Sequence, residues 1–293
     1  MSNTLKAALW MIGAIVAFST MAVAGRAVSS QLDTFEIMLY RSITGIVIVV
    51  VVIFATGKQH QINRERLGLH FLRNIAHFAG QNLWFYALPL IPLAQLFALE
   101  FTSPLWVLAL SPLLLGERLT RLRALSALLG FIGILIVARP GAVPIDAGMI
   151  TGALAAIGFA ITIILTKKLT QTTTITCILF YLTGMQALFG LIFAGIDGDI
   201  AVPTAANTPW IILIGCAGLM AHFCLTTALS LAPATIVVPI DFARLPAIAI
   251  VGMLFYNEPI DAFVLIGALV IFGANYLNIW SENRPKPSLQ STS

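Results

Sequence analysis

Residues 94–110 read AQLFALEFTSPLWVLAL, an apolar run that contains one ionisable side chain, Glu100. A run of this kind predicts a helix in a lipid bilayer, because lipid satisfies no backbone polar group and a helix pairs its own. An ionisable group at that depth costs about 2.5–3.5 kcal/mol on insertion scales. Such a group is kept where it faces the interior of a bundle or a wet cavity, so Glu100 predicts both a membrane fold and a functional site.

The whole chain has the composition of a membrane protein. Of its 293 residues, 59% are hydrophobic and 10% are charged, whereas a soluble domain carries about 25% charged residues. The net charge of +4 does not indicate nucleic-acid binding, because the basic residues cluster in short gaps between apolar runs. The three cysteines lie inside apolar runs without metal-ligand spacing, so we expect no disulfide, metal or cofactor.

Hydropathy divides the chain into ten predicted transmembrane helices, because a bilayer core of about 30 Å needs about 20 apolar residues per helix. The segments are too long and too evenly apolar for the strands of a barrel. We also expect a disordered cytoplasmic tail over 281–293. The predicted spans are 6–28, 35–57, 70–90, 94–115, 122–140, 148–167, 175–196, 209–230, 235–256 and 260–280.

The Lys and Arg residues between the spans predict the orientation, because cytoplasmic loops carry an excess of them. With the N-terminus inside, nearly all of these residues are cytoplasmic, and Arg139 lies in an outer loop. Arg26, Arg41 and Arg244 lie in or near spans and do not enter the comparison. We therefore expect an integral protein of a bacterial inner membrane with both termini in the cytoplasm.

The two halves of the chain align without gaps at an offset of 141 residues (241 minus 100), so that Glu100 meets Asp241. A repeat of five helices has an odd number of spans, and its two copies therefore insert with opposite topology. Many secondary transporters are built from such inverted repeats, with the substrate site at their interface. We expect one repeat over 1–140 and its inverted copy over 148–280. The alternative is an ancient duplication that only stabilises the bundle.

Short motifs recur in both halves. The first half contains ALPLIPLA at 87–94, SPLW at 103–106, LGERL at 115–119 and GFIGILIVARP at 130–140; the second contains ALSLAPA at 228–234 and YNEP at 256–259. By these motifs the chain resembles the EamA family of the drug/metabolite transporter superfamily. The resemblance covers nearly the whole chain. It implies a ten-helix metabolite carrier with alternating access, a cavity between the repeats, and export of small polar or aromatic metabolites.

Glu100 and Asp241 depart from the pattern that the resemblance implies, which has small or apolar residues at both positions. These charges therefore predict a role in this carrier's own cargo or coupling. A carboxyl group in a low-dielectric site can exchange protons near neutrality. Glu100 is accordingly the first candidate for proton coupling, and His77 or His222 is the second, although His77 can also be solvated near the cytoplasmic end of its span.

Polar side chains recur at helical spacing on the third, fourth, eighth and ninth predicted spans. Residues three or four apart share one face of a helix, so we expect these faces to converge on one cavity. The predicted substrate-binding residues are Glu100, Asp241, Arg244, Trp84, Gln81, His222, Trp106, Phe242 and Ser103.

The residue types in this set indicate a cargo of mixed character. Glu100 and Asp241 would face a cationic amine, Arg244 would hold a carboxylate through two parallel hydrogen bonds, and the aromatic residues would cover an apolar body. Structural interpretations stay open beside these roles. Asp241 and Arg244 can neutralise each other, Glu100 can pair with Arg41 or Arg244 to lock the bundle, and the tryptophans can simply pack.

The leading hypothesis is a secondary transporter that exports or exchanges an amino acid or another zwitterionic or cationic amine-bearing compound, such as a nucleoside derivative, with protons as the candidate coupling ion. The expected partners are a small-molecule substrate and the lipid bilayer, with no nucleic acid, in a monomer or homodimer. The rival is a membrane-embedded enzyme that uses Glu100, Asp241 and His77 as acid–base groups. The sequence shows no histidine box, no clustered nucleophile and no large soluble loop, so we expect no enzyme.

Overall fold

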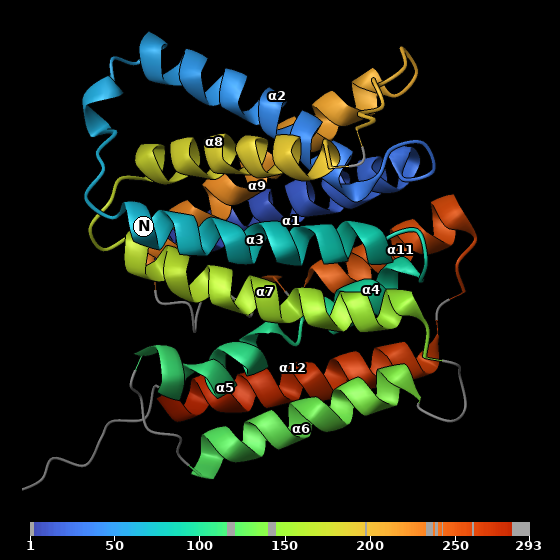
Figure 1. Cartoon of the computed structure of the whole chain (residues 1–293). Helices are drawn as coiled ribbons and strands as arrows, with labels where there is room; N and C mark the ends of the chain where they lie inside the picture. The colour runs from blue at the N-terminus through green and yellow to red at the C-terminus, as the bar shows by residue number, and fades with distance from the viewer. Residues whose placement is uncertain are drawn as a thin grey trace, which may run out of the picture.

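The computed structural model describes residues 3–115, 121–139, 145–196, 198–232, 237, 240–241, 243–259 and 261–282. Its helices lie side by side in one bundle (Figure 1), and the described ranges contain no β-strand. The predicted all-α architecture is confirmed. The elements are α1 (Asn3–Val28), α2 (Thr34–Ala55), the 3₁₀-helix η1 (Gln59–Gln61), α3 (Leu67–Ala87), α4 (Leu93–Glu100), α5 (Ser103–Leu115), α6 (Arg121–Ala138), α7 (Ala147–Leu169), α8 (Ile175–Ala194), α9 (Thr208–Leu231), α11 (Arg244–Tyr256) and α12 (Ala262–Glu282).

The long helices have the length and composition of membrane spans. Large apolar side chains such as Val51, Phe54, Phe255 and Leu269 are more than half exposed, as expected where lipid covers a helix. The expected tail falls mostly outside the described residues, since α12 continues to Glu282 and 283–293 are not described. Within the described ranges, the segments that by length and composition could cross a membrane are Leu5–Val28, Thr34–Ala55, Ala147–Leu169, Ile175–Ala194 and Thr208–Leu231.

The fourth predicted span, 94–115, is wrong as a single helix. α4 ends at Glu100, and α5 begins at Ser103 after a short turn. The cause is Pro104, which has no N–H to offer the carbonyl of Glu100 four residues earlier and whose ring would clash with that carbonyl. The Ser103 hydroxyl donates to it instead, at 2.5 Å. The break places Glu100 at the C-terminal end of α4.

The ninth predicted span, 235–256, restarts at the symmetric place. α11 begins at Arg244, which is the repeat counterpart of Ser103 at the start of α5. Pro246 lies in the first turn of α11 as Pro104 lies in the first turn of α5, and a first turn tolerates proline because its N–H groups have no partner inside the helix. Before Arg244, the structure describes residues 237, 240, 241 and 243 of this span.

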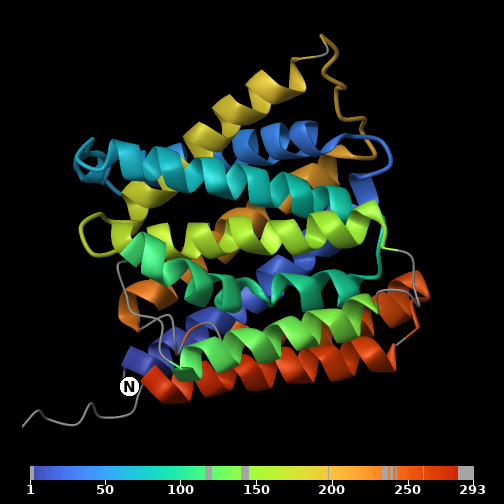
Figure 2. The same ribbon diagram turned by 60° about the horizontal axis from the view of Figure 1, so that its bottom comes forward.

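Helix packing follows a pseudo-two-fold relation. α2 packs against α8 and α6 against α12, and each of these pairs joins two repeat counterparts; α4 packs against α11, the counterpart of α5. The contact of α1 with α9 is the counterpart of the contact of α3 with α7. Both views show α2 and α8 toward one side of the bundle and α6 and α12 at the opposite side, with α3 and α7 between them (Figures 1 and 2). The chain therefore has the two inverted five-helix repeats that its sequence predicts.

Arg26 and Lys167 are repeat counterparts, and they make equivalent hydrogen bonds. The Arg26 guanidinium near the end of α1 donates to carbonyls after α3, and the Lys167 ammonium near the end of α7 donates to carbonyls at the end of α9. Carbonyls at a helix C-terminus lack partners in the helix, and a cation there is favourable. The contacts are Arg26 with Leu88 O and Ile91 O at 2.6 and 2.5 Å, and Lys167 with Leu229 O and Ala232 O at 2.7 and 3.5 Å. The cation and both carbonyls of one repeat match those of the other at the 141-residue offset, although the cation is Arg26 in the first repeat and Lys167 in the second.

Candidate functional site

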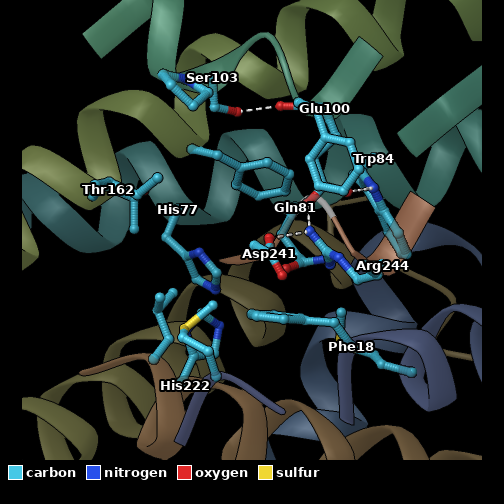
Figure 3. A pocket seen from close by; sticks show the side chains of 17 residues that line it. Phe18, His77, Gln81, Trp84, Glu100, Ser103, Thr162, His222, Asp241 and Arg244 are labelled. Carbon is cyan, nitrogen blue, oxygen red and sulfur yellow. Dashed lines mark hydrogen bonds and ion pairs between the residues drawn. The ribbon is translucent and has the colours of Figure 1, made fainter. Parts of the chain in front are cut away.

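A cavity with about 780 Å³ of empty volume lies among α1, α3, α7 and α9 and reaches the break between α4 and α5 (Figure 3). Its lining includes Phe18, Gln81 and His222, each near the middle of a long helix. The cavity therefore lies in the interior of the bundle, at membrane depth.

Twelve of the seventeen lining residues form six symmetric pairs, one member from each repeat. Each pair is related by the offset of 141 residues, which places the cavity on the pseudo-two-fold axis between the repeats. Substrate sites of inverted-repeat transporters lie at this interface. The pairs are Phe18 with Phe159, Met21 with Thr162, Gln81 with His222, Trp84 with Leu225, Glu100 with Asp241, and Ser103 with Arg244.

An arginine between two carboxylates forms the polar centre of the cavity. Arg244 donates from Nη2 to Glu100 Oε1 at 2.6 Å and to Asp241 Oδ2 at 2.7 Å. Its side chain is 3% exposed, against 14% for Glu100 and 20% for Asp241. Of the structural interpretations left open by the sequence, Glu100 pairs with Arg244 and not with Arg41, and Arg244 and Asp241 are also partners. With both acids ionised, these three side chains carry a net charge of −1.

The guanidinium of Arg244 is also packed between aromatic rings. Its Cζ lies 4.8 Å from the ring centroids of Phe18 and Phe97 and 5.3 Å from that of Phe101, in the range of cation–π attraction. Among the described residues, Asp241 Oδ1 and Arg244 Nε have no hydrogen-bond partner. The cluster thus holds the arginine firmly and leaves one buried oxygen of Asp241 without a hydrogen-bond partner among the described residues.

Trp84 fixes the orientation of Glu100. Its indole Nε1 donates to Glu100 Oε2 at 2.8 Å, so both oxygens of this carboxylate are occupied within the protein. The Trp84 ring packs edge to face against Phe85 and Phe97, with centroids 5.3 and 5.8 Å apart. Glu100 is therefore a pre-organised charge, whereas Asp241 keeps a free lone pair for another donor.

Two histidines meet at the other side of the cavity (Figure 3). The ring centroids of His77 and His222 are 4.6 Å apart, with the planes nearly perpendicular. His77 is 1% exposed, so its interpretation as a solvated residue near the cytoplasmic end is wrong: the helix carries it into the interior. Both nitrogens of His77 and Nε2 of His222 lack a partner within the described part of the chain. The described residues therefore leave the hydrogen-bonding capacity of these buried nitrogens unused.

Seven of the predicted binding residues line this cavity together with His77; that they bind a substrate stays a prediction. Trp106 does not line it, because the chain turns after Glu100 and helical spacing does not carry across that turn. Phe242 lies outside the described residues. The lining residues that the sequence did not single out as binding residues are Met11, Phe18, Met21, Phe101, Pro104, Phe159, Thr162, Ile163 and Leu225.

The repeat alignment held a signal for some of these residues. It pairs Phe18 with Phe159 and places Thr162 opposite Met21, which marks the first and sixth predicted spans as counterparts but does not show that these side chains face a cavity. The apolar lining otherwise looks like ordinary core in the sequence, since nothing in an apolar run marks which side chain faces a void.

A second charged cluster joins the repeats away from the cavity. Arg26 forms an ion pair with Glu258, and Glu258 Oε2 also accepts from the backbone N–H of Leu93 at 2.8 Å. The Arg26 guanidinium lies 4.9 Å from the ring centroid of Tyr256. These contacts link the end of α1 to the start of α4 and to the segment between α11 and α12. Glu117, the counterpart of Glu258, is outside the described residues.

The model of the EamA-like transporter family matches residues 5–139 and 146–280 of the chain. The S-adenosylmethionine uptake transporter of Rickettsia bellii (strain RML369-C) is 27% identical over 284 residues, which cover 94% of each chain. The riboflavin transporter of Vibrio cholerae is 28% identical over 291 residues, 97% of this chain and 96% of the relative. The riboflavin transporter of Brucella anthropi is 31% identical over 218 residues, 73% of this chain and 77% of the relative.

A solved crystal structure has the same fold. It superposes with a TM-score of 0.66 at 17% sequence identity and covers 93% of this chain and 96% of its own. At this identity the likeness shows the architecture alone. The three relatives given above are all named as transporters.

Proposed function

Since the chain belongs to the EamA-like transporter family and its relatives are named as transporters of small metabolites, we propose that its cargo carries a positive charge beside an apolar or aromatic body. The protein is an integral membrane transporter of a small metabolite, and the proposal concerns which one. The observation that carries it is the cluster of Glu100, Asp241 and Arg244, whose net charge of −1 at membrane depth is costly until a cation neutralises it.

The walls of the cavity suit a cargo with a ring. Phe18, Phe101 and Phe159 line it together with Trp84, and aromatic side chains supply large contact areas to planar molecules. An amine- or sulfonium-bearing nucleoside derivative combines a cation with such a ring. S-adenosylmethionine is a molecule of this kind, whereas riboflavin is uncharged at neutral pH and would leave the cluster uncompensated. We therefore propose a cargo of the S-adenosylmethionine type over one of the riboflavin type.

The unpaired oxygen of Asp241 gives the cluster two ways to become neutral. A cationic cargo can bind there, or in its absence a proton can, because burial in a low dielectric favours the neutral form of a carboxyl group. The two would exclude each other at one site. We therefore propose exchange of cargo against protons or against a second cationic metabolite, with Asp241 as the shared position and Glu100 as the fixed charge.

The packing of the helices suggests what moves. α1 packs on α9 and α3 packs on α7, so each repeat contributes to two helix pairs that flank the cavity. Arg26 on α1 binds carbonyls after α3, and Lys167 on α7 binds carbonyls of α9. These contacts tie the two helix pairs together at opposite ends of the bundle. We propose that one contact opens at a time, which exposes the cavity to alternate sides of the membrane.

The topology expected from the sequence is part of this proposal. It places both termini in the cytoplasm of a bacterial inner membrane, the repeats at 1–140 and 148–280, and the Arg26 contact at the outer end. Accessibility of single cysteines introduced near Asp33 and near Lys58 to a membrane-impermeant reagent, in intact cells, would test the orientation. Labelling near Lys58 alone would contradict it.

The function is tested by uptake into proteoliposomes. Vesicles loaded with unlabelled S-adenosylmethionine should take up labelled S-adenosylmethionine and release it intact, while riboflavin competes weakly. Asp241→Asn should reduce this uptake by about tenfold or more, because one charge-assisted contact with the cargo is lost.

A matched control separates binding from damage to the fold. Asp261→Asn removes a carboxylate that pairs with Arg139 outside the cavity, and its uptake should equal that of the unmodified protein. Uptake of riboflavin in place of S-adenosylmethionine, undiminished in Asp241→Asn, would contradict the proposed cargo. A chemically altered product inside the vesicles would favour the alternative hypothesis of a membrane-embedded enzyme.

A further inference from the structure

A second, smaller cavity lies beside the substrate cavity, between α2, α8 and α9. It has about 270 Å³ of empty volume, and its polar lining includes Arg41, Ser42, Gln186 and His222. His222 also lines the substrate cavity, so the two cavities share a wall. The smaller one extends from Arg41 to His222 at that wall.

Arg41 is a buried cation with no acid beside it. The residue is 7% exposed, and within the described ranges no carboxylate lies at ion-pair distance from it. Its Nη1 lies 3.5 Å from the sulfur of Met38, and its Cζ lies 5.9 Å from the ring centroid of Phe85. A thioether and a ring face are weak partners for a guanidinium, and an unpaired charge in a low dielectric is strongly unfavourable.

A second buried arginine, Arg73, adds to the uncompensated positive charge around Arg41. Arg73 is close enough to Arg41 for the two charges to interact, and it donates to the neutral acceptors Thr166 Oγ1 at 3.2 Å and Asn74 Oδ1 at 3.0 Å. Gln186 in turn donates to the backbone carbonyl of Asn74 at 2.8 Å. Two buried arginines thus face one region of the bundle in which the described residues supply only neutral acceptors.

The fold makes room for the Arg41 guanidinium next to the substrate cavity. A Cβ at Gly218 would lie 2.8 Å from Arg41 Nη2 and 3.4 Å from the sulfur of Met21, which lines the substrate cavity. Gly218 is the repeat counterpart of His77. Where one repeat directs an imidazole into the interior, the other therefore has no side chain, and the guanidinium occupies the neighbouring space.

We propose that the cavity around Arg41 is an anion subsite that binds the carboxylate of the transported molecule while the positive group of that molecule binds at Asp241. The inference rests on the proposed function for the cargo and assigns the carboxylate to Arg41 instead of Arg244. Arg244 already shares its Nη2 between two acids, whereas Arg41 offers a fork of N–H donors of the kind that binds carboxylates bidentately. Met21, a flexible side chain, and His222 form the boundary that the carboxylate would pass.

The test compares two ligands that differ only in the carboxylate. S-adenosylmethionine and its decarboxylated analogue are titrated against the full-length protein in detergent, with Arg41→Gln and Arg41→Lys as variants. The unmodified protein should bind S-adenosylmethionine more tightly than the analogue. Arg41→Gln should weaken S-adenosylmethionine by about tenfold or more and leave the analogue unchanged, and Arg41→Lys should retain part of the preference. Equal effects on the two ligands, or none, would overturn the proposal.

Gly218→Ala provides a second variant that keeps the charge. Its methyl group displaces the guanidinium from its position, and the same selective loss of S-adenosylmethionine is expected. If Arg41→Gln does not fold, this variant decides the matter by the same criterion.

Two further measurements separate this proposal from its alternatives. Sodium acetate, compared with a bulky sulfonate at equal ionic strength, should raise the unfolding temperature of the unmodified protein and not that of Arg41→Gln, which tests the subsite even if S-adenosylmethionine is not the cargo. No acetate effect would overturn the subsite. If uptake of the decarboxylated analogue depends on chloride and Arg41→Gln abolishes that dependence, the site holds a free inorganic anion and the assignment to the cargo is wrong.

Discussion

Arg244 and Arg41 are both buried arginines at membrane depth, and their surroundings are opposite. Arg244 has two carboxylates within 2.7 Å and three aromatic rings around its guanidinium. Arg41 has a methionine sulfur, one distant ring and a small cavity beside it. The first cluster has one negative charge too many, and the second has a positive charge without an acid among the described residues.

The comparison separates two uses of the same residue type. A buried ion pair with satisfied hydrogen bonds holds helices in place, and removing one partner leaves the other uncompensated. A buried charge that lacks a partner stabilises nothing by itself and indicates a binding role. A dipolar molecule that lies across the shared wall at His222 would compensate both clusters at once.

The largest expected difference is in stability. Arg244→Gln leaves Glu100 and Asp241 facing each other without a cation, and breaking a buried pair in this way costs about 3–5 kcal/mol. Arg41→Gln removes a charge that has no acid partner, so it should leave stability unchanged or raise it. The thermal unfolding midpoint of each purified variant in detergent measures this. If Arg41→Gln lowers the midpoint as much as Arg244→Gln does, the two sites do not differ as described.

Recovery of the stability lost in Arg244→Gln would test whether the two uncompensated acids cause that loss. Neutralising the acids as well, in the triple variant with Glu100→Gln and Asp241→Asn, should recover much of the lost stability, because the uncompensated charges are gone. Such non-additivity is expected for groups in one network. A triple variant that is less stable than Arg244→Gln would show that the arginine acts through packing alone.

A smaller effect is expected from the indole that orients Glu100. Trp84→Phe keeps a ring in place but removes the donor to Glu100 Oε2, and a hydrogen bond to a charged group contributes about 1.5–3 kcal/mol. Affinity for S-adenosylmethionine should fall because the freed carboxylate can reorient. Trp106→Phe is the matched control, since Trp106 does not line the cavity, and it should leave affinity unchanged. Equal losses in the two variants would assign both tryptophans to packing.

The smallest effect is expected at Met38. Met38→Leu conserves volume and removes the sulfur that lies 3.5 Å from Arg41, and such swaps usually cost less than about 1.5 kcal/mol. Uptake and its preference for a carboxylate should persist, because the sulfur is a weak acceptor. Loss of uptake in Met38→Leu, measured in proteoliposomes, would show that this contact positions Arg41.

Much of the fold and the acidic cluster could be predicted from the sequence. The run of ten apolar segments and the 141-residue offset lead to the inverted repeats. The spacing of Asp241 and Arg244 predicts that they are neighbours, and they are in contact although α11 begins only at Arg244. The break before Ser103 also had a sequence signal in Pro104, which a hydropathy window averages away. Assigning 94–115 to one helix is the reason that Trp106 was expected in the cavity.

The surroundings of Arg41 could not have been predicted from the sequence. Its position in an apolar run marks it as unusual, but whether an acid faces it depends on how α2, α8 and α9 cross. Helix crossing is set by side-chain packing across segments far apart in the chain, and a single sequence does not state it. The interior position of His77 depends on packing in the same way.

The proposed cargo specificity depends on Asp241, which would bind the positive charge of the cargo in the cavity. S-adenosylmethionine and S-adenosylhomocysteine test it most directly, since they differ by the methyl group that makes the sulfur a sulfonium cation. The dissociation constants of both, measured by titration calorimetry on the unmodified protein and on Asp241→Asn, should show a preference for the sulfonium of about tenfold or more that disappears in the variant. Equal affinity of the unmodified protein for both molecules, or a preference that survives in Asp241→Asn, would contradict the account.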